Sequence, residues 1–425
     1  MSILGFTPPA GWGNRSQLGF AVQALKDLEG NRDRMILNED RAPGVAKIGS
    51  NQNPLALRIK LSNALGFSPR DEVALLQRYR EYVEEKFGEV VIAPEVQAQL
   101  KHGELYAALK AIDLVALGRR PNEVRDGFLS AKGSVDGVEI APRKLHYQHF
   151  APIGEAKGQV VVVSPGFLES GVSFYELTQA LNKEGYDVVL GDHQWAGQSE
   201  GKAGGIDRGL GVARDAAAFG AYGARLAKEL YGDRGQVLLF GNSMGAGPGV
   251  TMALSYADHG RLKLDGDELP KGLPYVVTGA FYGPSDNAAN RILGFLGEVP
   301  AINRMPLPAF GQPVLTKSPI GGHLGAQSAV RIDARAQGQA NAAALPDLER
   351  FFGELAKGLR PLGAGAMLHS AQDSLADPGL ANKVAGHFGI ELQSLAGSDH
   401  VIQQSPAAIP KIVQAIEETF ARSKR

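Results

Sequence analysis

The stretch Val237-Leu-Leu-Phe-Gly-Asn-Ser-Met-Gly245 decides the fold. Its first four residues are apolar and have the density of a strand that is buried on both faces. The last five, from Gly241 to Gly245, form a G-x-S-x-G pattern between this strand and an expected helix. A serine in a tight strand-to-helix turn needs small neighbours, and its hydroxyl then projects above the sheet. The pattern therefore predicts that Ser243 is a nucleophile.

Working outward from this stretch, short strand-like runs alternate with longer helical patterns over residues 134–425. This alternation predicts an α/β domain whose mostly parallel sheet carries helices on its faces. We count eight strands, near residues 138–140, 144–151, 159–164, 187–191, 236–240, 275–281, 365–370 and 391–395. The clearest helices are expected at 174–183, 211–231, 347–359 and 411–422.

Two stretches fall outside this alternation. Residues 1–133 carry apolar residues at helical spacing, which predicts an N-terminal helical region. Residues 284–345 fit neither period and are rich in Pro, Gly, Ala and Asn. An insertion of this length in a compact domain is usually a lid or a binding segment. We therefore expect an N-terminal helical region at 1–133 and an α/β domain at 134–425 with a cap at about 284–345.

Composition excludes several classes of protein. The 44 Lys and Arg balance 45 Asp and Glu, so no overall field attracts nucleic acid. The absence of cysteine excludes disulfides, thiolate metal sites and a cysteine nucleophile. The one long uncharged run, residues 235–257, holds five glycines and several polar residues where a membrane helix is predominantly apolar. With no signal-peptide pattern at the start, we expect a cytoplasmic protein with no transmembrane segment.

A serine nucleophile needs a general base and a carboxylate that orients the base. When the nucleophile lies on a strand-to-helix turn, the acid and then the histidine follow it along the chain. His400 lies in the loop after the last expected strand and is the predicted base. Asp373 lies in the loop after the preceding strand and is the predicted acid. Asp399, next to the base, and Asp377, which can cap the following helix, are the alternatives for the acid.

Acyl transfer also needs donors for the oxyanion. One is the backbone amide after the nucleophile, that of Met244. The other is expected in the loop after the strand at 159–164, where Gly166 lets the backbone approach a substrate. The amide of Phe167 is the candidate for this second donor.

Taken together, these features resemble the α/β-hydrolase family, most closely its monoacylglycerol lipase and lysophospholipase-like branch. The resemblance covers residues 134–425. It is carried by Gly241-Asn-Ser-Met-Gly245, by the run 185–199 with its Asp192 and its Gly-x-Ser ending, and by the predicted acid and base. It implies an eight-stranded α/β-hydrolase sheet with a cap over an acyl pocket, and serine hydrolysis of carboxylic esters without a metal or other cofactor.

The chain departs from the family pattern at single residues and in the helical region before residue 133, which the resemblance does not cover. Pro165 stands where the family usually has a histidine before Gly166, and Asn242 stands where it usually has a histidine before the nucleophile. Neither change removes a backbone donor. Pro248, just beyond the first turn of the expected helix, predicts a local kink because it interrupts the hydrogen-bond ladder.

Three functions stay open at this stage. The leading one is an esterase or lipase that acts on monoacylglycerol-like or lysophospholipid-like substrates, a small ester or lipid that the enzyme meets in solution or by transient contact with a membrane surface. The second is an exopeptidase on the same triad, which the three acidic against five basic residues in 284–345 disfavour. The third is a protein-interaction module with an idle hydrolase domain. The sequence indicates no specific protein partner.

Overall fold

The computed structural model describes the greater part of the domain after residue 124. The described residues are 124–167, 169–194, 196, 199–200, 208–283, 346–371, 373, 376–395, 400, 402–404 and 407–424, together with two short strands at 35–37 and 46–48. The remaining N-terminal helices and the insertion at 284–345 that the sequence predicts lie outside this description.

A nine-stranded sheet organises the described part of the domain, in the order β11-β10-β9-β7-β5-β6-β4-β3-β8. From β11 to β6 neighbouring strands are parallel, and β4, β3 and β8 extend the sheet with an antiparallel edge. The strands are β3 (Val124–Val135), β4 (Val138–Phe150), β5 (Gln159–Ser164), β6 (Asp187–Gly191), β7 (Gln236–Asn242), β8 (Leu262–Leu264), β9 (Tyr275–Thr278), β10 (Gly365–Ser370) and β11 (Leu392–Leu395).

The sequence predicts eight strands, and the described residues form nine in this sheet. The runs predicted at 138–140 and 144–151 are one strand, β4, while β3 and β8 were not expected. The assignment of residues 124–133 to the helical region is therefore wrong, because they pair with β4 as a hairpin. The turn of this hairpin, Asp136-Gly137, has positive φ angles of 55° and 74°, as a tight hairpin connection requires.

Two short strands also lie in the N-terminal region that the sequence predicts to be helical. There β1 (Met35–Leu37) and β2 (Ala46–Ile48) pair antiparallel as a separate two-stranded sheet. They belong to a different compact unit from the nine-stranded sheet.

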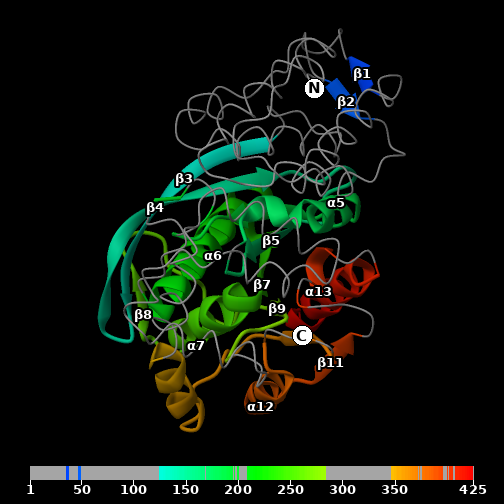
Figure 1. Ribbon diagram of the computed structural model, residues 1–425. Helices are drawn as coiled ribbons and strands as arrows, with labels where there is room; N and C mark the ends of the chain where they lie inside the picture. The colour runs from blue at the N-terminus through cyan, green and yellow to red at the C-terminus, as the bar shows by residue number, and fades with distance from the viewer. Residues whose placement is uncertain are drawn as a thin grey trace, which may run out of the picture. The chain divides into compact units, whose positions relative to one another are not determined.

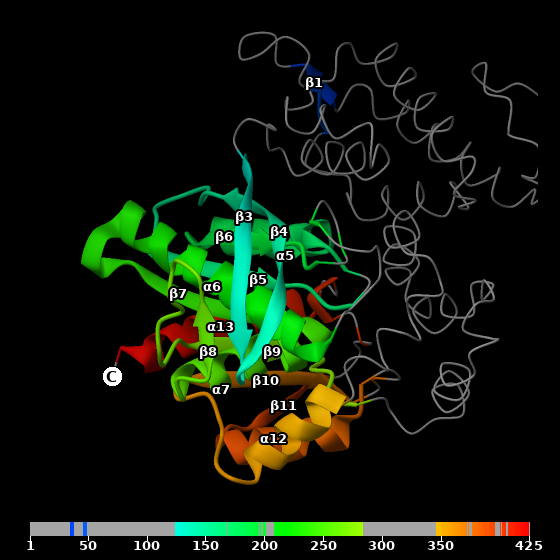
Figure 2. The same cartoon turned by 90° about the vertical axis from the view of Figure 1, so that its left-hand side faces the viewer.

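Helices cover both faces of the large sheet (Figure 1, Figure 2). On one face α5 (Tyr175–Lys183) packs with α13 (Ile409–Ser423), and on the other α6 (Gly209–Tyr231) packs with α7 (Met252–Asp258). The approach of α6 to β5 is so close that a Cβ at Gly223 would lie 2.2 Å from a methyl group of Val162. Between these layers the valines of β5 are fully buried. None of the described helices has both the length and the hydropathy of a membrane span.

Helix α12 (Pro378–Phe388) packs against β10 and β11 at the far end of the sheet. It begins at Asp377, whose carboxylate accepts hydrogen bonds from the amides of Gly379 and Leu380. The prediction that Asp377 caps this helix is confirmed.

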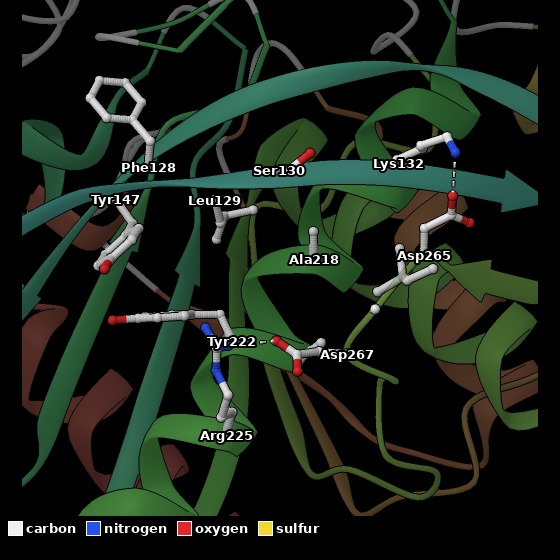
Figure 3. Close-up of a pocket in the computed structure, with 13 residues that line it drawn as sticks. Phe128, Leu129, Ser130, Lys132, Tyr147, Ala218, Tyr222, Arg225, Asp265 and Asp267 are labelled. Carbon is white, nitrogen blue, oxygen red and sulfur yellow. Dashed lines mark ion pairs between the residues drawn. The ribbon is translucent and has the colours of Figure 1, made fainter.

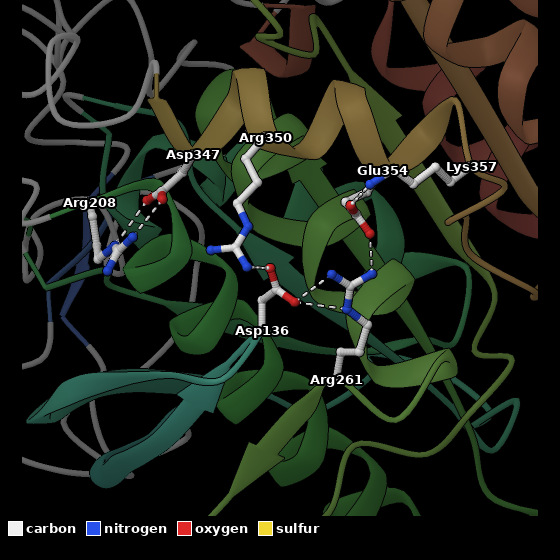
Figure 4. A network of polar contacts seen from close by, with 7 residues as sticks. All are labelled: Asp136, Arg208, Arg261, Asp347, Arg350, Glu354 and Lys357. Carbon is white, nitrogen blue, oxygen red and sulfur yellow. Dashed lines mark hydrogen bonds and ion pairs between the residues drawn. The ribbon is translucent and has the colours of Figure 1, made fainter.

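Ion pairs fix the helix at 346–355, which follows the insertion in sequence (Figure 4). Asp347 accepts from the Arg208 guanidinium at 2.7 and 3.1 Å and from the Leu210 amide at 3.0 Å. Arg261 bridges Asp136, in the β3–β4 turn, and Glu354 on this helix, and Asp136 also pairs with Arg350. The network therefore joins the helix to the hairpin edge of the sheet and to the start of α6.

Candidate active site

The turn after β7 holds Ser243 in a strained conformation. Ser243 begins a short 3₁₀ turn, Ser243–Gly245, and has a positive φ of 53°. Such an angle costs a non-glycine residue about 1–3 kcal/mol and persists only where the surroundings enforce it. The flanking glycines are required, because a Cβ at Gly241 would meet the Gly245 carbonyl oxygen at 2.5 Å and one at Gly245 would meet the Ser164 carbonyl oxygen at 2.1 Å.

The helix after this turn begins irregularly. Residues Ala246–Thr251 form a π-helical segment that continues into α7. Pro248 lies within it and has no N–H to donate, so the regular ladder is interrupted there, as the sequence predicts.

The structure brings the three predicted side chains of the triad together. The Oγ atom of Ser243 lies 2.8 Å from Nε2 of His400, and Nδ1 of His400 lies 2.8 Å from Oδ2 of Asp373. All three residues are buried, each with 7% exposure. A proton can pass from the hydroxyl to the imidazole at these distances.

The carboxyl of Asp373 is held in its ionised form. Burial alone would raise its pKa. The charge of His400, the hydrogen bond with this imidazole and a hydrogen bond donated by the Ala376 amide at 2.9 Å together lower the pKa below its ordinary value. A second histidine, His369, lies 3.4 Å from the same carboxylate, and burial lowers its pKa. Of the alternative acids, Asp377 is engaged in the α12 cap, and Asp399 lies outside the described residues.

The loop that follows β5 and carries Pro165, Gly166 and Phe167, here named the β5 loop, lies against the nucleophile. A Cβ at Gly166 would lie 2.8 Å from the Cβ of Ser243. The predicted oxyanion donors, the amides of Met244 and Phe167, thus belong to two segments that are in contact. On its other side, the Ser243 carbonyl accepts a hydrogen bond from the Phe281 amide at 3.0 Å.

A buried carboxylate beside the site was not predicted. Glu169 is 4% exposed and accepts from the Gly166 amide at 2.5 Å and from Nδ2 of Asn242 at 3.0 Å. It also accepts a hydrogen bond from Gln403, three residues after the predicted base. The sequence shows an ionisable residue in the loop next to the expected oxyanion donors, and this could have marked Glu169 as a site residue. Its burial could not be predicted, because it depends on three segments that are distant along the chain.

A second polar chain lies beneath the turn. Ser164, the last residue of β5, bonds Nε2 of His193 through its hydroxyl at 2.8 Å. Nδ1 of His193 lies 3.6 Å from Asp215, which pairs with Arg214 at 2.8 Å. These side chains are almost fully buried, so we interpret Ser164 as a structural support for the turn.

A separate hollow of about 320 Å³ lies between the β3–β4 hairpin, α6 and the loop after β8 (Figure 3). Its charged side chains pair with one another, Lys132 with Asp265 at 2.5 Å and Arg225 with Asp267 at 3.3 Å. The residues that line it include neither Ser243 nor its partners. It is not part of the candidate active site.

Comparison with known proteins agrees with this architecture. Residues 154–264, about a quarter of the chain, match the family model described as serine aminopeptidase, S33, of the Hydrolase_4 type. This segment contains β5 to β8 and the Ser243 turn. Together with the observed strand order, this match shows that the domain has an α/β-hydrolase fold. No curated protein shows significant similarity to the sequence.

Several solved structures are similar to this chain at low identity. A thermophilic esterase from Thermogutta terrifontis is 19% identical with a TM-score of 0.46, and the match covers 70% of this chain and 100% of the esterase. A soluble variant of monoglyceride lipase from Saccharomyces cerevisiae is 15% identical with a TM-score of 0.47, covering 69% and 96% of the two chains. The monoacylglycerol lipase of Paleococcus ferrophilus is 16% identical with a TM-score of 0.40, covering 64% and 97%.

Proposed function

We propose that the protein is a serine hydrolase that cleaves carboxylic esters through an acyl-enzyme. The observation that carries the proposal is the unbroken chain of 2.8 Å contacts from Ser243 through His400 to Asp373. In this proposal Ser243 is the nucleophile, His400 the general base and Asp373 the orienting acid. The strained backbone at Ser243 supports it, because strain of this kind persists where it serves a function.

In the acylation step, Oγ of Ser243 forms a bond to the carbonyl carbon of the ester while its proton passes to Nε2 of His400. The ionised Asp373 holds Nδ1–H and favours the imidazolium that results. The negative charge moves to the former carbonyl oxygen, where the amides of Met244 and Phe167 are the proposed donors. Collapse of the tetrahedral intermediate breaks the ester C–O bond, and the imidazolium returns the proton to the departing alcohol.

In the deacylation step, water takes the place of the alcohol. His400 removes a proton from this water as the oxygen attacks the acyl carbon, and a second tetrahedral intermediate forms. Its collapse breaks the bond to Oγ, the imidazolium returns a proton to Ser243, and the carboxylic acid leaves. In this proposal both steps use the same side chains and amides, and water is the added reactant.

The sequence resemblance also indicates a substrate class. We infer a monoacylglycerol-like or lysophospholipid-like ester from the sequence resemblance. The experiment is hydrolysis of p-nitrophenyl esters from short to long acyl chains, with Ser243→Ala as the control, together with labelling by a fluorophosphonate. We expect turnover and labelling that both disappear in the variant. Turnover that survives in Ser243→Ala contradicts the proposal.

An aminopeptidase is the second candidate, because the matching family model carries that description. A substrate with a free α-amino group needs a carboxylate that is available to bind it. Two carboxylates described near the nucleophile are engaged: Asp373 holds His400, and Glu169 accepts three N–H donors. Amino-acid p-nitroanilides assayed beside the esters decide between the two, and faster release from the anilides would favour the peptidase.

A further inference from the structure

Glu169 connects the three segments that form the candidate active site. Its Oε2 accepts hydrogen bonds from the Gly166 amide in the β5 loop and from Nδ2 of Asn242, which directly precedes Ser243. Its Oε1 accepts a hydrogen bond from Nε2 of Gln403 in the 3₁₀ turn Ile402–Gln404. The three segments are far apart along the chain, and each carries one part of the proposed machinery. A displacement of this carboxylate therefore moves the oxyanion donors, the serine and the base relative to one another.

The orientation of the Asn242 amide is fixed from the other side. The hydroxyl of Thr278, the last residue of β9, donates to Oδ1 of Asn242 at 2.9 Å. This bond leaves Nδ2 of Asn242 directed at Glu169. All three described partners of Glu169 are then N–H donors, which is the environment of an ionised carboxylate, since a neutral carboxyl needs an acceptor for its own proton.

The charge on Glu169 is buried close to the reaction centre. Gly166 lies between the carboxylate and the nucleophile, because a Cβ at this glycine would meet Glu169 Oε2 at 2.6 Å and Ser243 Cβ at 2.8 Å. Burial raises the pKa of Glu169 above its ordinary value, and the donated hydrogen bonds and the charge of His400 only partly oppose this shift. The charge of His400 is therefore one of the interactions that act on this carboxylate.

We propose that Glu169 is a positioning residue whose negative charge favours the imidazolium of His400 while its hydrogen bonds fix the β5 loop against the nucleophile turn. The proposal rests on the proposed function and adds a second anion to the triad. The titratable groups that act on the His400 imidazole include Asp373 and His369 on the β10 side and Glu169 on the β5 side. Removing the charge of Glu169 lowers the pKa of the base, because an anion nearby stabilises the protonated imidazole.

The test is the pH dependence of fluorophosphonate labelling and of ester hydrolysis in Glu169→Gln. We expect kcat to fall about 10- to 100-fold with KM little changed, because a small displacement of the reacting groups is costly. We also expect the acid limb of both profiles to move to lower pH by about 0.5–1 unit. Glu169→Asp keeps the charge but not the reach, so its rate falls while its acid limb stays at the wild-type position.

The matched control for net charge is Glu229→Gln on the exposed side of α6, which leaves rate and pH profile unchanged. An acid limb that does not move in Glu169→Gln, or a kcat within about twofold of wild type, overturns the proposal. If Glu169→Gln does not fold, Gln403→Met removes one donor and keeps the carboxylate. A lower kcat at constant KM supports the proposal, and an unchanged kcat overturns it.

Failure of the proposed function gives a different result. Wild-type protein that is folded yet neither labelled by the fluorophosphonate nor active on any ester contradicts the serine hydrolase itself. Wild-type protein that is labelled, while Glu169→Gln is labelled at the same rate and with the same pH dependence, contradicts only the role of Glu169.

Discussion

Gly166 packs so closely against Ser243 that a side chain on the glycine would meet the Cβ of the serine at 2.8 Å. The same added atom would lie 2.6 Å from Oε2 of Glu169. Both neighbours belong to the candidate site, so a methyl group here forces the β5 loop away from the nucleophile. The loop that is expected to receive the oxyanion therefore tolerates no side chain at this position.

The first prediction concerns this contact. We expect Gly166→Ala to lower kcat/KM by about 100-fold or more, because the amide of Phe167 moves with the loop. Steady-state kinetics on a p-nitrophenyl ester measure the effect. Gly154→Ala is the matched control, since a Cβ there meets nothing within 4 Å, and it leaves the rate unchanged. Wild-type kinetics in Gly166→Ala would show that the β5 loop takes no part.

A second prediction separates two aspartates of one loop region. Asp373→Asn keeps the shape of the side chain but loses the charge that favours imidazolium, so we expect kcat to fall by about 10³- to 10⁴-fold. Asp377→Asn is its control, because asparagine caps a helix as well as aspartate, and we expect rates within about twofold of wild type. Equal losses in the two variants would mean that Asp373 acts only through stability.

A third prediction concerns the packing of α6 on β5. Gly223→Ala places a methyl group within 2.2 Å of Val162, and such overpacking costs about 1–3 kcal/mol of unfolding free energy. Gly353→Ala, in the helix at 346–355, meets nothing within 4 Å and is expected to stabilise by about 0.5–1 kcal/mol. Urea unfolding measures both. Opposite signs are expected, and a stable Gly223→Ala would show that α6 can shift without cost.

A fourth prediction concerns the stability of the protein at low pH. Hydrogen bonds from Lys357 and Arg261 lower the pKa of Glu354 to about 2, from an ordinary value of 4.5. A lowered pKa in the folded state contributes stability above the unfolded value, and this contribution disappears as the pH falls through the folded value. We therefore expect Glu354→Gln to reduce Tm at about pH 7 and to match wild type at about pH 2.

The control for this pH dependence is Glu349→Gln, an exposed residue of the same helix. It should leave Tm unchanged at both pH values. If the deficit of Glu354→Gln were as large in acid as at neutral pH, the ion pairs in Figure 4 would not be its cause.

Strands with dense branched residues between turn signals were predictable from the sequence. The expected bounds of β5, β6 and β10 coincide with those observed. In contrast, β3 was missed because its twelve residues include two glycines and five charged or hydroxyl side chains beside its apolar positions. Its identity as a strand comes from pairing with β4. The Asp136-Gly137 pair is the local hairpin signal in this part of the sequence.

The residues of the candidate site also fall into a predictable group and a group that the sequence does not reveal. Ser243, His400 and Asp373 follow from local motifs and from the order of strands, and the structure places them in hydrogen-bond contact; their catalytic roles stay predictions. Glu169 and its partner Gln403 have no local motif. Their contact joins residues 234 positions apart and depends on how two loops meet over the sheet, which periodicity cannot reveal.

The hydrogen bond from the Phe281 amide to the Ser243 carbonyl has a practical consequence for protein engineering. Phe281 lies just before the stretch at 284–345, and Asp347, clamped by Arg208, lies just after it. Segments exchanged between Phe281 and Asp347 keep both of these contacts. We therefore expect such exchanges to leave the backbone support of Ser243 unchanged. A graft that also replaces Phe281 alters the hydrogen bond that supports the Ser243 backbone, so we expect it to displace the nucleophile.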